Sequence, residues 1–141
     1  MLKEQTYKIN AGLLVLRIAA GLSLFALFGL NKLKSGADYF FVSHQWSFVD
    51  FNRNIGLPLP VLSAVVQTLN ESVCALLVAI GFFTRISALL LAIGFTVAVC
   101  SSLKAHEDIL IPGLYASMFV ALALTGPGKF SIDSIIRRKR S

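Results

Sequence analysis

The sequence predicts an all-α integral membrane protein, a bundle of four transmembrane helices with an aromatic-rich interfacial or re-entrant segment between the first and the second. Hydrophobic residues make up 56% of the chain and charged residues only 14%, and the mean hydropathy is +0.76. A chain of this composition has too little polar surface to cover a water-soluble globule. Four long apolar segments divide the sequence, and short connections join the last three. We expect one domain over residues 1–141.

Each apolar segment is close to the ~17–25 residues that a helix needs to cross about 30 Å of hydrocarbon. We predict helices at residues 9–30, 61–83, 86–103 and 109–125. Pro112 falls in the first turn of the last segment, where its missing N–H breaks no helical hydrogen bond. Residues 131–141 carry apolar isoleucines and the basic run RRKR, which is typical of an amphipathic tail that lies on an anionic membrane surface.

The connections predict the topology. Only two residues separate the second and third helices, and residues 104–108 separate the third and fourth, so these neighbours should run antiparallel. On the side of the two termini we count eight basic residues, against four on the other side: Lys3, Lys8, Arg85, Lys129, Arg137, Arg138, Lys139 and Arg140, against Lys32, Lys34, Arg53 and Lys104. The positive-inside rule then predicts a multi-pass protein of the cell (inner, cytoplasmic) membrane with both termini in the cytoplasm.

The connection over residues 31–60 is unusually aromatic. Its rings include Tyr39, Trp46, Phe48 and Phe51, and rings of this density favour the headgroup level of a membrane. Two interpretations stay open. The segment either anchors on the outer leaflet or forms a re-entrant lid over a pocket between the helices, with Trp46 beside that pocket.

Two charges interrupt the predicted spans, and both need a partner. Charged residues cost roughly 2.5 to 3.5 kcal/mol each at the centre of an inserted helix. On the second helix Gln67 and Glu71 lie on one stripe with Asn70 beside it, so this stripe should face the bundle interior. Arg17 lies on the first helix at a depth within ~5 Å of Glu71. We therefore predict that Arg17 and Glu71 form an ion pair.

The role of that polar cluster has two alternatives. The pair could be purely structural, with the amides satisfying its spare hydrogen-bonding groups. Alternatively, Arg17, Gln67, Asn70 and Glu71 could form an intramembrane pocket for a lipid headgroup, a quinone carbonyl or a proton. Small residues every fourth position from Gly113 to Thr125 favour close helix packing, and such a face could also support a homo-oligomer.

Several function classes have little support. The basic residues form no stripe with interleaved aromatics, so we expect no nucleic-acid partner. Cys74 and Cys100 lack a C-x-x-C arrangement, and both histidines lie in connections, which argues against a dithiol centre and a transmembrane haem. No zinc spacing, phosphate loop or hydrolytic triad is present in the sequence, so we expect no metal site and identify no catalytic residue.

The chain contains, in order, the segments LRIAAG (16–21), GLNKL (29–33), GLPLP (56–60), NES (70–72), GFFTR (81–85) and GPGKFSID (126–133). Together these six segments resemble the DoxX family of small four-helix membrane proteins. The resemblance covers nearly the whole chain. It implies a four-helix bundle and an association with redox chemistry, because the family is named for a subunit of an archaeal thiosulfate:quinone oxidoreductase.

Two hypotheses follow from the residues and the resemblance. The first is a membrane subunit associated with redox chemistry that binds a quinone-like or lipidic ligand in its polar pocket, with a soluble or membrane redox partner as the electron source. The second is a noncatalytic membrane assembly protein whose charged pair is structural. The sequence does not identify a cofactor, and a quinone is the candidate under the first hypothesis. The lipid bilayer is the expected partner of the protein under both.

Overall fold

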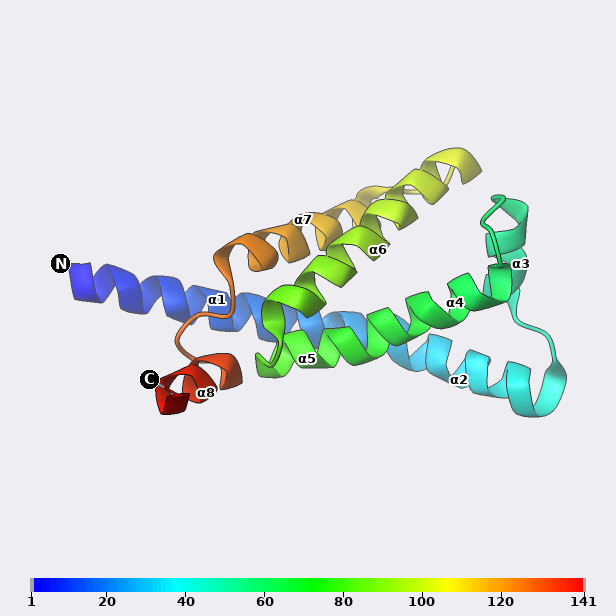
Figure 1. Cartoon of the computed structure of the whole chain (residues 1–141). Helices are drawn as coiled ribbons and strands as arrows, with labels where there is room; N and C mark the ends of the chain where they lie inside the picture. Colours follow the sequence, from blue (N-terminus) through cyan, green and yellow to red (C-terminus); the bar gives the residue numbers. More distant parts are fainter. Residues whose placement is uncertain (1, 141) are drawn as a thin grey trace.

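In the computed structural model, which describes residues 2–140, every regular element is helical (Figure 1). The prediction of an all-α membrane bundle is confirmed. The elements are α1 (Leu2–Leu24), α2 (Leu30–Asp38), α3 (Ser47–Asn54), α4 (Pro60–Leu69), α5 (Ala75–Ile80), α6 (Thr84–Ala105), α7 (Leu110–Thr125) and α8 (Ile132–Arg140). Three π-helical turns interrupt them: η1 (Phe25–Gly29), η2 (Tyr39–Ser43) and η3 (Asn70–Cys74).

The first helix is much longer than predicted. It runs without a break through α1, η1, α2 and η2, and residues 3–43 form a single apolar helical stretch of 41 residues, about 60 Å long. The predicted end near residue 30 is wrong because the polar run after it contains no proline, and its leucine, lysine and alanine residues favour helix. The helix finally ends at His44, whose backbone is left-handed with φ 52°.

Helices are present at the other three predicted positions, with limits that differ by a few residues. The second is α4, η3 and α5 in series, from Pro60 to Ile80. It ends three residues early because Gly81 adopts the left-handed conformation (φ 78°) that terminates many helices. Residues 81–83 therefore make the hairpin that leads into α6, and Thr84 already belongs to that helix.

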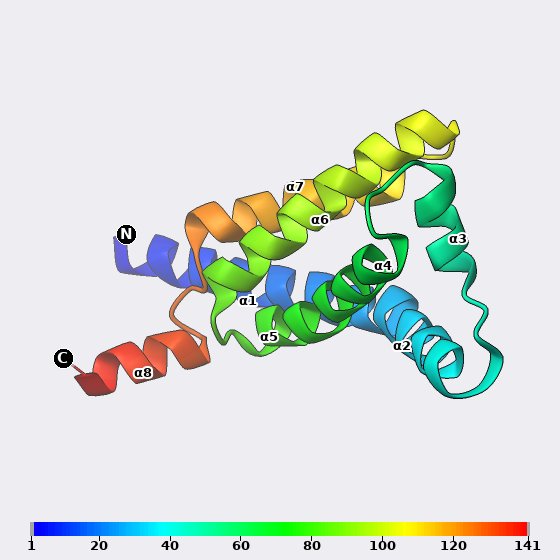
Figure 2. The ribbon, with the colours of Figure 1, turned by 45° about the vertical axis from the view of Figure 1, so that its right-hand side comes forward.

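Three helical stretches are long and apolar enough to cross a membrane, over residues 3–43, 60–80 and 84–105. The helix α7 is apolar but has 16 residues, about 24 Å at 1.5 Å per residue. Both chain ends lie at the same end of the molecule in both views (Figures 1 and 2). Four crossings would place the termini on one side of a membrane, as the sequence predicts.

The core lies between α1, α5, α6 and α7. Its buried side chains include Leu24, Val78, Leu91, Phe119 and Leu122. The predicted small-residue face of the last span does not pack in this core. Ser117, Ala121 and Thr125 are exposed, and bulky residues between them face inward instead. The reason is that the aromatic stack of Phe95, Tyr115 and Phe119 fills the contact between α6 and α7.

The aromatic connection is folded, not a loose loop. After a turn at residues 44–46, α3 lies across one end of the bundle beside the start of α4 (Figure 2). Trp46, Val49 and Ala64 form a small buried cluster that fixes α3 against α4. The segment thus covers the bundle end, as the predicted lid would.

Candidate functional site

The most polar part of the bundle interior is a cluster of three side chains below α3. The Lys32 ammonium of α2 lies 2.8 Å from both carboxylate oxygens of Glu71 in η3. Gln67 of α4 donates a hydrogen bond from Nε2 to the same carboxylate at 3.1 Å. The exposed fractions are 21% for the Lys32 side chain and 5% for Glu71. The pair is therefore largely buried. An unpaired charge at such a buried position would be costly.

These three residues line a pocket of about 270 Å³ between α2, α3, α4, α6 and the start of α7. Aromatic rings form much of its wall, including Phe28 and Phe95 from the bundle. Phe48 and Phe51 of α3 close it, and their rings stack with centroids 6.4 Å apart. The Lys32 ammonium lies 4.1 Å from the Phe48 ring centroid, which is a cation–π contact between the ion pair and the lid.

Trp46, predicted beside the pocket, packs between α3 and the start of α4, on the side of α3 away from the pocket. It is 4% exposed and packs with Tyr39, Phe48 and the cluster at the start of α4. Gly36 makes this possible, because a Cβ at that position would lie 3.1 Å from the indole ring. Trp46 thus positions α3 without lining the pocket.

Two π-helical turns place Glu71. The turns η1 and η3 meet where Gly29 approaches the second helix so closely that a Cβ there would lie 2.9 Å from the Glu71 carbonyl oxygen. A π-helical turn adds a residue to one turn of helix and so redirects the side chains that follow it. Such turns frequently occur at functional sites.

Asn70 is not part of this pocket. Its Nδ2 donates to the Leu90 carbonyl oxygen of α6 at 3.0 Å, and it lines a separate groove of about 580 Å³ between α4, η3 and α6. This groove is almost entirely apolar, with Ile93 and Val97 among its walls. Leu57 and Gln67 line both the groove and the pocket, so the two spaces are neighbours divided by these side chains.

The predicted Arg17–Glu71 ion pair is wrong. The Arg17 guanidinium donates to the carbonyl oxygens of Pro127 and Phe130, the latter at 2.7 Å, in the segment before α8. A Cβ on Gly81 would lie 2.7 Å from Arg17 Nη1, so Arg17 is level with the end of α5. Because Glu71 lies ten residues before Gly81, the two charges are offset by about 15 Å along the bundle.

Arg17 belongs to a different assembly that holds the C-terminal segment. Asp133 accepts hydrogen bonds from the backbone N–H groups of Phe83 and Thr84, each at 2.9 Å, and so caps the start of α6. Ser131 instead caps α8 by accepting from the Ser134 N–H at 3.1 Å. Asp133 thus joins the chain end to the hairpin before α6, a contact between residues 49 and 50 positions apart in the sequence.

Lys32 is the functional candidate that sequence reasoning missed. The sequence prediction ends the first helix at residue 30 and so places Lys32 in the outer connection over residues 31–60. The available signal was the absence of a proline between Arg17 and Lys32, which lie fifteen residues apart on one uninterrupted helix. At 1.5 Å per residue this spacing is about 22 Å, which is enough to bring Lys32 to the depth of Glu71.

Comparison with known proteins can now be set beside this geometry. The DoxX family model matches residues 12–106, which include Arg17, Lys32, Gln67 and Glu71. The chain belongs to the DoxX family. It is also 32% identical over 135 residues to the inner membrane protein YphA of Escherichia coli strain K12, an alignment that covers 86% of this chain and 87% of YphA. No solved structure matches the chain.

The DoxX segments recognised in the sequence gather at two places in the fold. GLNKL, GLPLP and NES lie around the pocket, where they supply Lys32, Glu71 and the turn into α4. LRIAAG, GFFTR and GPGKFSID meet at the opposite end, where they supply Arg17 and Asp133 with their partners. The DoxX protein thus has one polar assembly beside a cavity and one that joins the chain ends.

Proposed function

We propose that this DoxX protein is a membrane subunit associated with redox chemistry that binds a quinone-like lipidic ligand in the pocket of Lys32, Gln67 and Glu71. The observation that carries the proposal is a largely buried ion pair on the wall of an aromatic cavity. A buried ion pair contributes little to stability, and intramembrane charges commonly mark ligand or proton sites. Ligand pockets typically combine apolar walls with a few convergent polar groups.

The donor set fits a carbonyl-bearing ring. Lys32 has three N–H donors, of which one is hydrogen-bonded to Glu71 Oε1, and its ammonium lies 2.8 Å from Oε2. A further N–H can donate to a carbonyl oxygen of a ligand, while the rings of Phe48, Phe51 and Phe95 offer flat apolar faces to the ring itself. Gln67 and Glu71 keep the ammonium oriented toward the cavity.

The neighbouring groove fits the remainder of such a ligand. Its apolar walls between α4 and α6 would accept an isoprenoid tail, and the boundary with the pocket is formed by Leu57 and Gln67. A ring in the pocket with its tail in the groove would therefore pass these two side chains. Asn70, on the groove side, would contact the tail region and not the ring.

A bound quinone would supply reversible uptake of two electrons and two protons. The residues of this chain would bind and orient the ring, exclude water beneath α3 and hold protons at Lys32 and Glu71. The electrons would come from a soluble or membrane redox partner. We further propose that the protein lies in the cell (inner) membrane with both termini in the cytoplasm and the lidded pocket at the outer side, as the distribution of basic residues favours.

The test is the quinone content of purified protein, measured by solvent extraction and chromatography. Wild-type protein should carry quinone. Ala98→Leu places extra volume in the pocket and should abolish most of it, whereas Cys100→Leu, an exposed site two residues along the same helix, should not. Gln67→Leu should lower the quinone content while the protein stays folded by circular dichroism.

Two results would overturn the proposal. The first is folded wild-type protein that carries no quinone, even after reconstitution with an excess of it. Alternatively, Ala98→Leu and Cys100→Leu could retain equal amounts. Either outcome would leave the noncatalytic assembly protein, with Lys32 and Glu71 as a structural pair, as the better function.

A further inference from the structure

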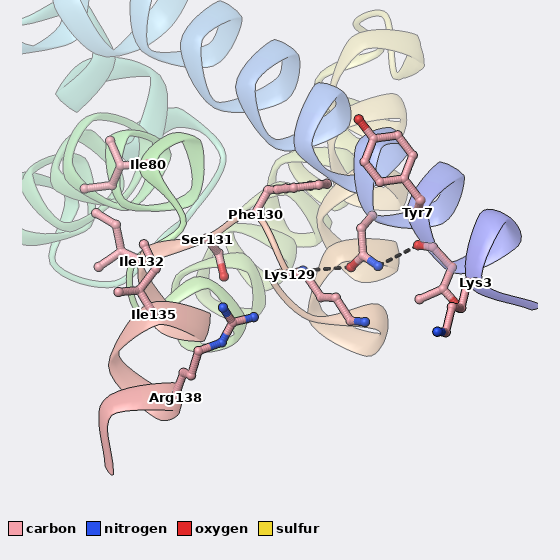
Figure 3. Close-up of a pocket in the computed structure, with 11 residues that line it drawn as sticks. Lys3, Tyr7, Ile80, Lys129, Phe130, Ser131, Ile132, Ile135 and Arg138 are labelled. Atoms are coloured by element: carbon pink, nitrogen blue, oxygen red, sulfur yellow. Dashed lines mark hydrogen bonds between the residues drawn. The ribbon is translucent and has the colours of Figure 1, made fainter. Parts of the chain in front are cut away.

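A second binding site lies at the opposite end of the bundle from the lidded pocket. A groove of about 830 Å³ runs between the first turns of α1, the end of α5 and the helix α8. Figure 3 shows Ile80, Ile132 and Ile135 gathered on one side of this groove and Lys3 and Lys129 on the other. The guanidinium of Arg138 reaches from α8 toward the space between them (Figure 3).

The polar side of the groove is cationic and lacks a counter-charge. Three of its lining residues are basic, and none is acidic. The nearest carboxylates along the chain are engaged elsewhere, since Glu4 pairs with Lys8 at 2.8 Å and Asp133 caps α6. Within residues 2–140, none of Lys3, Lys129 and Arg138 forms an ion pair with a carboxylate. Three unpaired cations around one cavity attract an anion.

The groove has fixed walls. The Asn10 side chain is buried, accepts a hydrogen bond from the Lys129 backbone N–H at 2.7 Å and donates to the Thr6 carbonyl oxygen at 2.6 Å. It thereby ties the segment that carries Lys129 to α1. The rings of Tyr7 and Phe130 pack edge to face across the same contact, with centroids 5.7 Å apart.

The position along the bundle matches a lipid headgroup. Ile80 is the last residue of one membrane-spanning stretch, and Thr84 begins the next. The groove therefore starts where the apolar helices end and continues past them along the first turns of α1. The isoleucines on its floor can contact acyl chains, while the basic side chains stand at the level of the phosphates.

We propose that this groove binds the headgroup of an anionic phospholipid from the leaflet on the side of the chain termini. The phosphate would lie among Lys3, Lys129 and Arg138, and the first carbons of the acyl chains would lie over Ile80, Ile132 and Ile135. This site is independent of the proposed quinone pocket. It differs from a general electrostatic attraction of the basic tail because only residues that line the groove contribute to it.

The experiment measures lipid retained by the full-length protein in native mass spectrometry, after incubation in mixed micelles with equal phosphatidylglycerol and phosphatidylcholine. The wild-type protein should retain phosphatidylglycerol preferentially. Arg138→Gln should lower that preference about fivefold, which corresponds to one lost surface cation, and Lys129→Gln should do the same. Lys139→Gln is the matched control, since it removes the same charge from the same helix but does not line the groove.

The control decides between a site and a diffuse field. With a defined site, Lys139→Gln changes the preference by less than about twofold, whereas a diffuse attraction predicts equal losses for neighbouring cations. Equal losses for Arg138→Gln and Lys139→Gln would overturn the proposal. So would equal retention of the two lipids by the wild-type protein. All these side chains are exposed, so the variants should fold.

Discussion

The ion pair of Lys32 and Glu71 makes a sharp prediction about stability. Lys32→Met leaves the Glu71 carboxylate without its cation, and Glu71→Gln leaves the ammonium without its anion. Each single variant thus keeps one largely buried charge and removes the opposite charge that neutralises it. The double variant removes both charges, replaces them with neutral side chains of similar length and leaves Gln67 a neutral amide partner.

The magnitude follows from burial. Breaking one partner of a buried pair costs roughly 3 to 5 kcal/mol, and replacing both can be nearly neutral. Because the Lys32 side chain keeps 21% of its exposure, we expect the lower end, about 3 kcal/mol for each single variant. The double variant should then lose about 4 kcal/mol, less than the roughly 6 kcal/mol expected for additive losses, which is a coupling energy of about 2 kcal/mol, within the range of contacting charged pairs.

The assay is reversible unfolding in mixed micelles by titration with a denaturing detergent, followed by circular dichroism. A second cycle with Arg17→Gln and Glu71→Gln serves as the control. These two residues have different partners and an offset of about 15 Å along the bundle. Their losses should add to within about 0.5 kcal/mol.

The result that would refute this reasoning is equally specific. If Lys32→Met and Glu71→Gln add without coupling, the two side chains are not in contact. If the coupling appears instead between Arg17 and Glu71, then the pairing inferred from the sequence alone is correct and the packing of the first helix described above is wrong.

Three further predictions test other parts of the molecule. Gly29→Ala should destabilise the protein by about 1 to 3 kcal/mol, because a methyl group there would lie 2.9 Å from the η3 backbone. Gly12→Ala is the control and should be neutral or stabilising, because no atom lies within 4 Å of its added methyl group. Equal effects of the two substitutions would contradict the close approach of Gly29 to η3. Asp133→Ala should cost about 1 to 2 kcal/mol in thermal unfolding because the start of α6 loses its cap, and an unchanged midpoint would show that the cap contributes nothing. In a variant without native cysteines, a cysteine at Ser43 should react with an impermeant thiol reagent in intact cells and one at Ser141 should not; the reverse pattern would contradict the proposed orientation.

Much of the fold could be predicted because the bilayer limits the choices. Four apolar segments of sufficient length had to be helices, since only helices satisfy their backbone hydrogen bonds without partners in lipid. The limits of the last three helices were predicted to within a few residues from the lengths of their apolar runs. Pro60 starts the second helix as its backbone preference favours, whereas the predicted end at residue 83 overlooked Gly81, which ends that helix. The positions of these helices can therefore be read from the sequence of each segment alone, without knowledge of its contacts in the fold.

The length of the first helix could not be predicted in the same way. Residues 31–43 are polar enough for a loop and compatible with a helix, so their composition does not decide between the two. Trp46 packs against Gly36 and holds α3 over the start of α4. The choice of charge partners depends on this length. With the helix ended at residue 30, Arg17 was the only cation within reach of Glu71; with the helix continued, Lys32 lies directly beside it.

The two charged assemblies show that burial of a charge does not by itself mark a functional site in this bundle. Arg17 is 1% exposed, its Nη1 and Nη2 donate to backbone carbonyl oxygens, and it lines neither the lidded pocket nor the two grooves. Its partners lie in the segment before α8, so it joins the first helix to the chain end. Lys32 and Glu71 compensate each other's charge as well, but they do so on the wall of the lidded pocket, where a ligand can reach the pair. The proposed function rests on Lys32 and not on Arg17 because Lys32 lines that pocket and Arg17 does not.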